Sequence, residues 1–215
     1  MIVYEPFRTK PLADFHDELI FEFPKLPSQL LDYYLLRVAN TMARQGNLIR
    51  RVAIIEAQPG VTRYRLEAPD GSDIVGVMDI RKMHSCSRLS ETVVRSFTAP
   101  ADSYTCRKDV AWYDDAEKVL HVDPSFCHGD YHVTLAVAPA KDACELPEQF
   151  YTEFFPTLMM GVKGALMLIV GRPWTNLRVG QACTEEFLKM LAADSLDTAT
   201  HKQRGGVKMQ FGRVL

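Results

Sequence analysis

The hydrophobic period changes twice along this chain, and this change constrains the fold more than any other feature. From Gln29 to about Arg51, apolar residues recur with the 3.6-residue spacing of an amphipathic helix. From Val52 to about Pro139, the period falls to two, which is typical of strands. After Leu146-Pro147 the helical period returns. We therefore expect helices from both ends of the sequence and a β-rich block between them.

The first helix has recognisable ends. Ser28 is of the N-cap type, and Gly46-Asn47 can break the helix near its end. A second helix is expected to start at Pro147 and to be kinked at Pro156, because proline removes one backbone hydrogen bond.

The second and third helices are expected to cross closely. Gly161 and Gly164 lie one turn apart, and glycines at this spacing let two helices approach. The short loop Gly171-Arg172-Pro173-Trp174 precedes a helix capped by Thr175 or Asn176. So short a connection predicts two antiparallel helices, with Trp174 as an apolar anchor of this hairpin.

Seven strands are predicted in the β-rich block. Asp70-Gly71 and Asp114 to Glu117 are expected to form hairpin loops between adjacent strands. The expected strands are Val52 to Ala57, Arg63 to Ala68, Ile74 to Lys82, Val93 to Thr98, Val110 to Tyr113, Val119 to Val122 and Tyr131 to Ala138.

Both ends of the chain are expected to be extended arms. Residues 1–27 hold four prolines and no sustained period. At the other end, Gly205-Gly206 forms a hinge, after which apolar and polar side chains alternate as on a strand. The alternating segment consists of Val207, Lys208, Met209, Gln210 and Phe211, followed by Arg213.

The expected fold class is therefore α+β. A helical bundle of about three main helices would comprise residues 28–51 and 147–200, and a β-rich meander or sandwich, residues 52–146, would be inserted into it. Residues 1–27 and 201–215 would be the N- and C-terminal arms.

Charge and composition exclude several classes of protein. The 25 Lys and Arg against 27 Asp and Glu give a net charge of -2, without the basic excess of a dedicated nucleic-acid-binding protein. Positive charge is local, at Arg37, Arg44, Arg50 and Arg51 and in residues 201–215. The N-terminus lacks an apolar signal core, and no apolar stretch reaches the length of a membrane span, so we expect a protein made in the cytoplasm.

Ligand-type residues gather at Cys127, His128 and His132, with His121 upstream and Cys144 downstream. Their spacing does not match standard zinc templates, and the five cysteines form no CxxC pair. No P-loop, GxSxG, HExxH or GxGxxG motif is present. We expect no enzyme and no cofactor; a small metal-dependent enzyme using Cys127, His128 and His132 stays open as one alternative.

A second alternative is a nucleic-acid-binding regulator that uses the basic segment Arg37 to Arg51. Arg37 and Arg44 are seven residues apart and share one helix face. Neither basic segment has interleaved aromatic residues that could stack on bases. Contact with a phosphate backbone would therefore be weak and strongly salt-dependent.

The order of features resembles the head-to-tail adaptors, or connector proteins, of tailed-bacteriophage virions. The resemblance covers most of the chain from about residue 28. The matching segments are Leu31 to Leu35 with Ala39, the strand Tyr64 to Leu66 followed by Pro69 to Gly71, and a closing module. This closing module comprises Leu146-Pro147, Gly164 to Leu166, Gly171 to Trp174, and a helix with Phe187 before a basic tail.

The resemblance implies a structural virion protein at the head-tail interface. Its helical domain would form a ring under the portal protein, twelvefold in symmetry, and its β-rich part would face the tail nozzle or tube proteins. The C-terminal arm, Val207 to Phe211 with Arg213, would bind the portal. Arg37 and Arg44 would make transient, non-specific contact with the genomic DNA in the channel.

Overall fold

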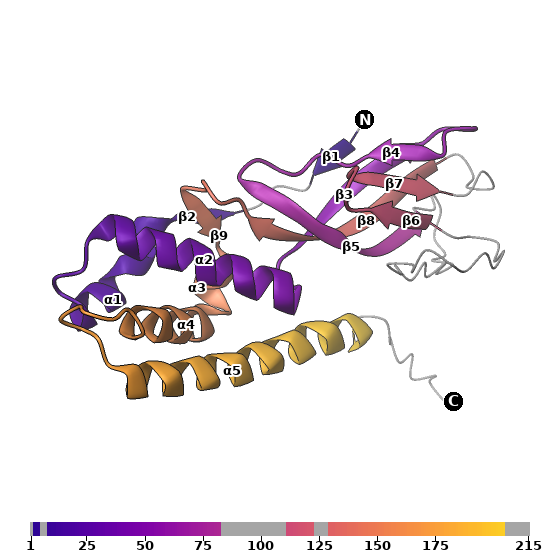
Figure 1. Cartoon of the computed structure of the whole chain (residues 1–215). Coiled ribbons are helices and arrows are strands. Elements are labelled where there is room, and N and C mark those ends of the chain that lie inside the picture. Colours follow the sequence, from indigo (N-terminus) through magenta and orange to yellow (C-terminus); the bar gives the residue numbers. More distant parts are fainter. Residues whose placement is uncertain (1, 5–7, 83–110, 123–128, 205–215) are drawn as a thin grey trace, which may run out of the picture.

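The computed structural model describes residues 2–4, 8–82, 111–122 and 129–204 (Figure 1). Helices gather at one end of the molecule and strands at the other, so the expected mixture of helices and a β-rich block is confirmed (Figure 1). The finer arrangement, a three-helix bundle carrying a meander or sandwich, is not confirmed, because the described strands form three small sheets.

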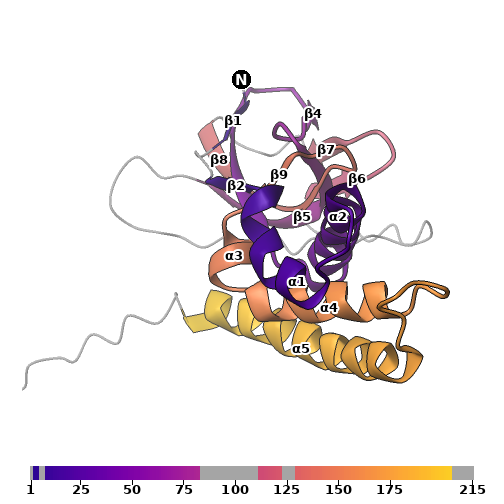
Figure 2. The same ribbon diagram turned by 90° about the vertical axis from the view of Figure 1, so that its left-hand side faces the viewer.

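Three helices make up most of the helical end. They are α2 (Ser28–Gly46), α4 (Phe155–Met167) and α5 (Leu177–Arg204). Helix α2 ends where the sequence predicts, because Asn47 adopts the left-handed conformation (φ 49°) that asparagine tolerates after a helix. Figure 2 shows α5 alongside α4, on the side away from the sheets.

The expected kink at Pro156 is wrong. A short helix, α3 (Gln149–Thr152), ends first, and Pro156 lies in the first turn of the separate helix α4. The first backbone N–H groups of a helix have no partner within it, so the missing donor of proline costs nothing there.

The expectation of an extended N-terminal arm at residues 1–27 is also wrong for residues 12–22, which are helical. A 3-10 turn, η1 (Leu12–Phe15), leads into helix α1 (His16–Glu22). The prolines lie before and after this helical stretch, at Pro11 and Pro24, and leave it intact. Its apolar residues are spaced for one helix face and are buried in the core: Leu12, Phe15, Leu19 and Phe23.

The largest sheet has the order β1-β3-β8-β5, and all its pairs are antiparallel. Its strands are β1 (Ile2–Tyr4), β3 (Arg50–Ala57), β8 (Gly129–Pro139) and β5 (Ser72–Lys82). A second sheet has the order β4-β7-β6, with β4 (Arg63–Arg65), β7 (Val119–Val122) and β6 (Ala111–Asp114). Strands β2 (Thr9–Pro11) and β9 (Glu145–Pro147) pair with each other and tie the N-terminal segment to the start of the second helical segment.

Six predicted strands overlap strands of the structure, and the seventh, Val93 to Thr98, lies outside the described residues. The hairpin at Asp114 to Glu117 is confirmed, because β6 pairs with β7 and the Asp114 carboxylate accepts hydrogen bonds from two N–H groups of the loop. The hairpin at Asp70-Gly71 is wrong. A turn exists there, with Gly71 at φ 70°, but it connects β4 to β5, which belong to different sheets.

One hydrophobic cluster runs through both ends of the molecule. It includes Leu35 and Met42 of α2, Leu135 of β8 and Leu158 of α4. At the junction, the Asn40 side-chain amide donates to the carbonyl oxygen of Pro139 over 2.8 Å. The expected division of the chain into a helical domain and an inserted domain stays a prediction.

Candidate functional site

The closing module is organised around a close crossing of α4 and α5. A Cβ atom on Gly164 would lie 2.9 Å from the Thr184 Oγ1 atom and 3.3 Å from the carbonyl oxygen of Gly180. A Cβ atom on Gly161 would lie 2.6 Å from Val38 and 2.8 Å from the Phe187 ring. Real Cβ atoms do not approach so closely, so these glycines permit the contact and the predicted close crossing is confirmed.

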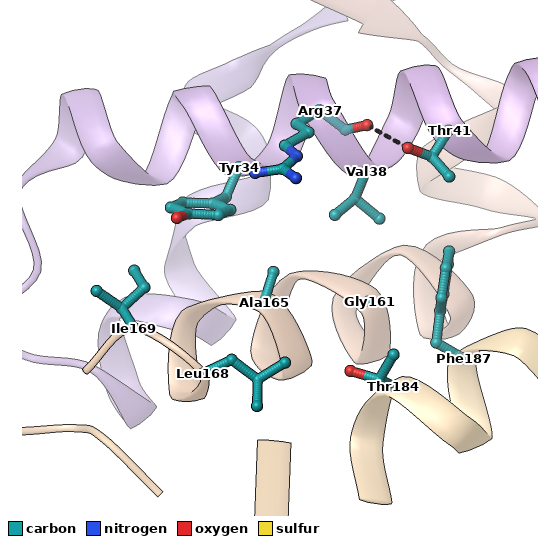
Figure 3. Close-up of a pocket in the computed structure, with 10 residues that line it drawn as sticks. All are labelled: Tyr34, Arg37, Val38, Thr41, Gly161, Ala165, Leu168, Ile169, Thr184 and Phe187. Carbon is teal, nitrogen blue, oxygen red and sulfur yellow. Dashed lines mark hydrogen bonds between the residues drawn. The ribbon is translucent and has the colours of Figure 1, made fainter. Parts of the chain in front are cut away.

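A groove of about 480 Å³ opens beside this crossing, between α2, α4 and α5 (Figure 3). Most of its lining is apolar, and Arg37 is the one charged residue among the described residues that line it. The residues are Tyr34, Arg37, Val38 and Thr41 of α2, Gly161 and Ala165 of α4, Leu168 and Ile169 just after α4, and Thr184 and Phe187 of α5. Such a surface suits an apolar side chain with a nearby negative charge.

The two arginines predicted to contact DNA share the exposed side of α2 but have different surroundings. Arg37 lies at the groove, and its backbone carbonyl oxygen accepts a hydrogen bond from Thr41 over 2.9 Å (Figure 3). Arg44 lies at the junction with the sheet, where its guanidinium group is 3.2 Å from the Asp73 carboxylate and donates to Asn40 over 2.9 Å. Asp73 therefore offsets part of the positive charge at Arg44.

Arg50 and Arg51 do not extend this basic surface as a continuous face. Both lie on β3 and are half-buried. Burial lowers the pKa of Arg50 below its usual value, because the interior disfavours the charged form. The segment Arg37 to Arg51, which a nucleic-acid-binding regulator would use, is thus divided between an exposed helix and a partly buried strand.

Trp174 lies in the loop between α4 and α5 and packs against the core while remaining partly exposed. Its indole Nε1 atom is buried and makes no hydrogen bond to the described residues. The role of Trp174 as the anchor of this hairpin stays a prediction.

Of the predicted metal-type residues, Cys127 and His128 lie outside the described residues. His132 is on β8 opposite Ile54, and Cys144 is exposed before β9. A different group does converge: Asp114, Glu117 and His121 each place one potential ligand atom within 4.8 Å of the others. Two carboxylates and an imidazole can hold a divalent cation, although the Asp114 carboxylate already accepts the N–H groups of its own loop.

The first residues of the predicted C-terminal arm, residues 201–204, are helical and do not form an extended segment. Residues 201–204 belong to the end of α5, which continues to Arg204. The portal-binding residues Val207, Lys208, Met209, Gln210, Phe211 and Arg213 lie outside the described residues.

Sequence reasoning missed the groove and the exposed side of α1. The groove combines residues from both ends of the sequence, so no local pattern reveals it. The spacing of Leu12, Phe15, Leu19 and Phe23 was the available signal for a helical segment near the N-terminus, and the prolines around it obscured that signal.

Within the part of the chain that the structure describes, no helix is both long enough and apolar enough to cross a membrane. No protein-family model matches the chain, and no curated protein matches it.

Proposed function

We propose that this protein is a head-to-tail adaptor of a tailed bacteriophage. Its role is structural and non-enzymatic: it forms a twelvefold ring between the portal and the tail. The helical end contacts the portal side, the β-rich end faces the nozzle or tube proteins, and the C-terminal arm binds the portal. The isolated protein is monomeric or weakly associated and becomes a ring only on the portal, because a repeating head-to-tail contact closes only if the rotation between neighbours is fixed.

The observation that supports this proposal most is the packing of the closing module. Its motifs are separated in the sequence, yet they contribute to one unit. Leu146 is fully buried, Gly164 lies against Thr184 of α5, and Phe187 packs over Gly161. Gly164 and Phe187, two of the residues on which the resemblance depends, therefore help to fix the α4–α5 crossing.

The placement of the exposed basic groups also fits a channel protein. Arg37 and Arg44 are exposed on one side of α2, about 10 Å apart along the helix axis. The pairing of Arg44 with Asp73 leaves little net charge for DNA at that position. We expect sequence-independent DNA affinity that is weak and falls steeply as the salt concentration rises. Affinity that survives high salt, or that favours one sequence, would support the regulator instead.

The proposal is tested by mixing the purified protein with purified portal rings and imaging the mixture by electron microscopy. The expected result is an added ring of protein density with the portal's symmetry. A chain lacking residues 205–215 is the matched control, because it removes the arm and leaves every described residue in place. It should melt at nearly the same temperature and fail to bind the portal.

Two results would contradict the adaptor function. One is a full-length protein that leaves portal rings bare at concentrations well above those of the portal. The other is purification with a stoichiometric metal ion together with hydrolytic or redox activity, which would favour the metal-dependent enzyme. If the truncated protein binds as well as the full chain, only the role of the arm is wrong.

A further inference from the structure

Helix α1 presents an apolar surface to solvent. Phe21 is 90% exposed and Ile20 is 46% exposed. Both lie on the same side of the helix as the exposed Asp17, because residues three and four positions apart share a helix face. This exposed side therefore carries an aromatic ring, an aliphatic side chain and the Asp17 carboxylate. Glu18, three residues before Phe21, lies at its edge, where it pairs with Lys163.

The groove beside the α4–α5 crossing complements this exposed side of α1 in both its apolar lining and its charge. Its apolar lining includes Tyr34 and Val38 of α2 and Ile169 after α4, and Arg37 supplies a positive charge (Figure 3). A cavity of about 480 Å³ is large enough for an aromatic side chain with neighbouring atoms of its helix.

The two surfaces lie on opposite sides of the same protein. Lys163 of α4 contacts α1, with its Nζ atom 2.6 Å from the Glu22 carboxylate and 3.6 Å from that of Glu18. Gly161 and Ala165, which line the groove, lie about 160 to 200° around α4 from Lys163, because each helical residue turns about 100°. Helix α1 is thus separated from the groove by the body of α4, and Phe21 cannot enter the groove of its own chain.

We propose that Phe21 of one copy inserts into the groove of a neighbouring copy of this chain, with Asp17 facing Arg37 of that neighbour. Two different surfaces meet in this contact, so each copy inserts its Phe21 into one neighbour and receives the Phe21 of the other neighbour in its groove. Such a head-to-tail contact repeats, and it closes into a ring when the rotation between neighbours is a whole fraction of a turn.

This contact rests on the proposed function in that it supplies the joint between neighbours in the ring. It assigns Arg37 to the adjacent copy, and because Asp73 offsets the charge of Arg44, it leaves little positive charge on α2 for contact with DNA. An apolar contact with a single charge pair gives modest affinity, which agrees with a ring that forms on the portal.

The first test is self-association of Phe21→Glu and Arg37→Glu proteins, measured by sedimentation over a concentration series. Each should associate about tenfold more weakly than the parent and melt at the same temperature, because both side chains are exposed. Asp17→Lys combined with Arg37→Glu should recover part of the loss. Val61→Ala, which alters an exposed apolar side chain far from both surfaces, should associate like the parent.

The second test is photo-cross-linking with p-benzoylphenylalanine in place of Phe21, at high protein concentration and on portal rings. The expected product joins two copies, with the cross-link in residues 34–41 or 165–169 of the second copy. Cross-links only within one chain, only to the portal, or to other parts of the neighbour would overturn the proposal, as would a Phe21→Glu protein that associates like the parent.

The outcomes separate this contact from the adaptor function. If Phe21→Glu protein still completes a ring on the portal, the contact is wrong and the adaptor function stands. If full-length protein leaves portals bare but the two-copy cross-link forms at the expected residues, the contact stands and the adaptor function is wrong.

Discussion

The helical end and the β-rich end of this molecule use glycine in opposite ways. In α4, a side chain on Gly161 or Gly164 would collide with a neighbouring helix. In β5, a Cβ atom on Gly76 would meet nothing within 4 Å among the described residues. The helical end therefore depends on close approach at Gly161 and Gly164, whereas β5 has room for a side chain at Gly76. A glycine is required at the first two positions and replaceable at the third.

The prediction with the largest expected effect tests whether the helical end and the β-rich end unfold together. Leu158 of α4 and Leu135 of β8 are both fully buried in the shared core. Leu158→Ala and Leu135→Ala should each lower the free energy of unfolding by about 2–5 kcal/mol, because each leaves a cavity. The protein has two tryptophans, Trp112 on β6 at the β-rich end and Trp174 beside α5 at the helical end. Urea unfolding of the β-rich end can be followed by Trp112 fluorescence in a Trp174→Phe protein. Unfolding of the helical end can be followed by Trp174 fluorescence in a Trp112→Phe protein.

If the core acts as one cooperative unit, both tryptophans will report the same midpoint, and either alanine substitution will shift both. Two separate midpoints, with Leu135→Ala affecting only the Trp112 signal, would show instead that the β-rich block unfolds as an independent domain.

The next effect sharpens the contrast between glycines. Gly161→Ala should destabilise the protein by about 1–2 kcal/mol, because overpacking against Val38 and Phe187 exceeds the gain in helix propensity. The matched control Gly76→Ala should be neutral or stabilise by up to about 1 kcal/mol, since it restricts only the unfolded chain. Thermal melts of the two proteins check this, and equal losses at both sites would refute the distinction.

A smaller effect comes from the ion pairs that hold α1 to α4. Burial lowers the pKa of Lys163. The hydrogen bonds and negative charges of Glu22 and Glu18 outweigh this effect of burial and raise the pKa above its ordinary value of 10.5. Lys163→Met should cost about 1 kcal/mol near neutral pH, where the lysine is charged in both the folded and unfolded states.

The sign of the pH dependence follows from this raised pKa. The stabilisation by Lys163 is complete below the unfolded-state pKa and is lost as the pH rises through the higher folded-state pKa. Denaturant titrations from neutral pH upward should therefore show the parent and Lys163→Met converging in the alkaline range. A difference that had already vanished by pH 8 would contradict the assignment.

The smallest effect concerns the charged link between the two ends. The Arg44 and Asp73 side chains are each nearly half exposed, so solvent screens their attraction. A double-mutant cycle with Arg44→Ala and Asp73→Ala should give a coupling of no more than about 0.5 kcal/mol in unfolding experiments. A coupling above about 1 kcal/mol would show that the ends are joined by surface charge as much as by the core.

The sequence predicted the features that depend on neighbouring residues. The end of α2 at Asn47, the loop at Asp114 and the glycine crossing in α4 all follow from local conformational preferences. The pairing of β4 with β7 does not follow from local preferences, because Asp70-Gly71 specifies a turn but not the partners of the strands beside it. The groove was equally hidden, since it needs Tyr34 and Phe187, which lie far apart in the sequence, to come together.

The length of α5 has a mechanical consequence. Among its side chains whose burial the structure describes, Leu191 is the last buried one. Ser195 donates a hydrogen bond to the carbonyl oxygen of Gly46 over 3.4 Å near the end of α2. Beyond Ser195 the helix continues for about 14 Å, to Arg204. A small bend in this terminal section would displace Arg204 while Phe187 and Leu191 keep their buried positions.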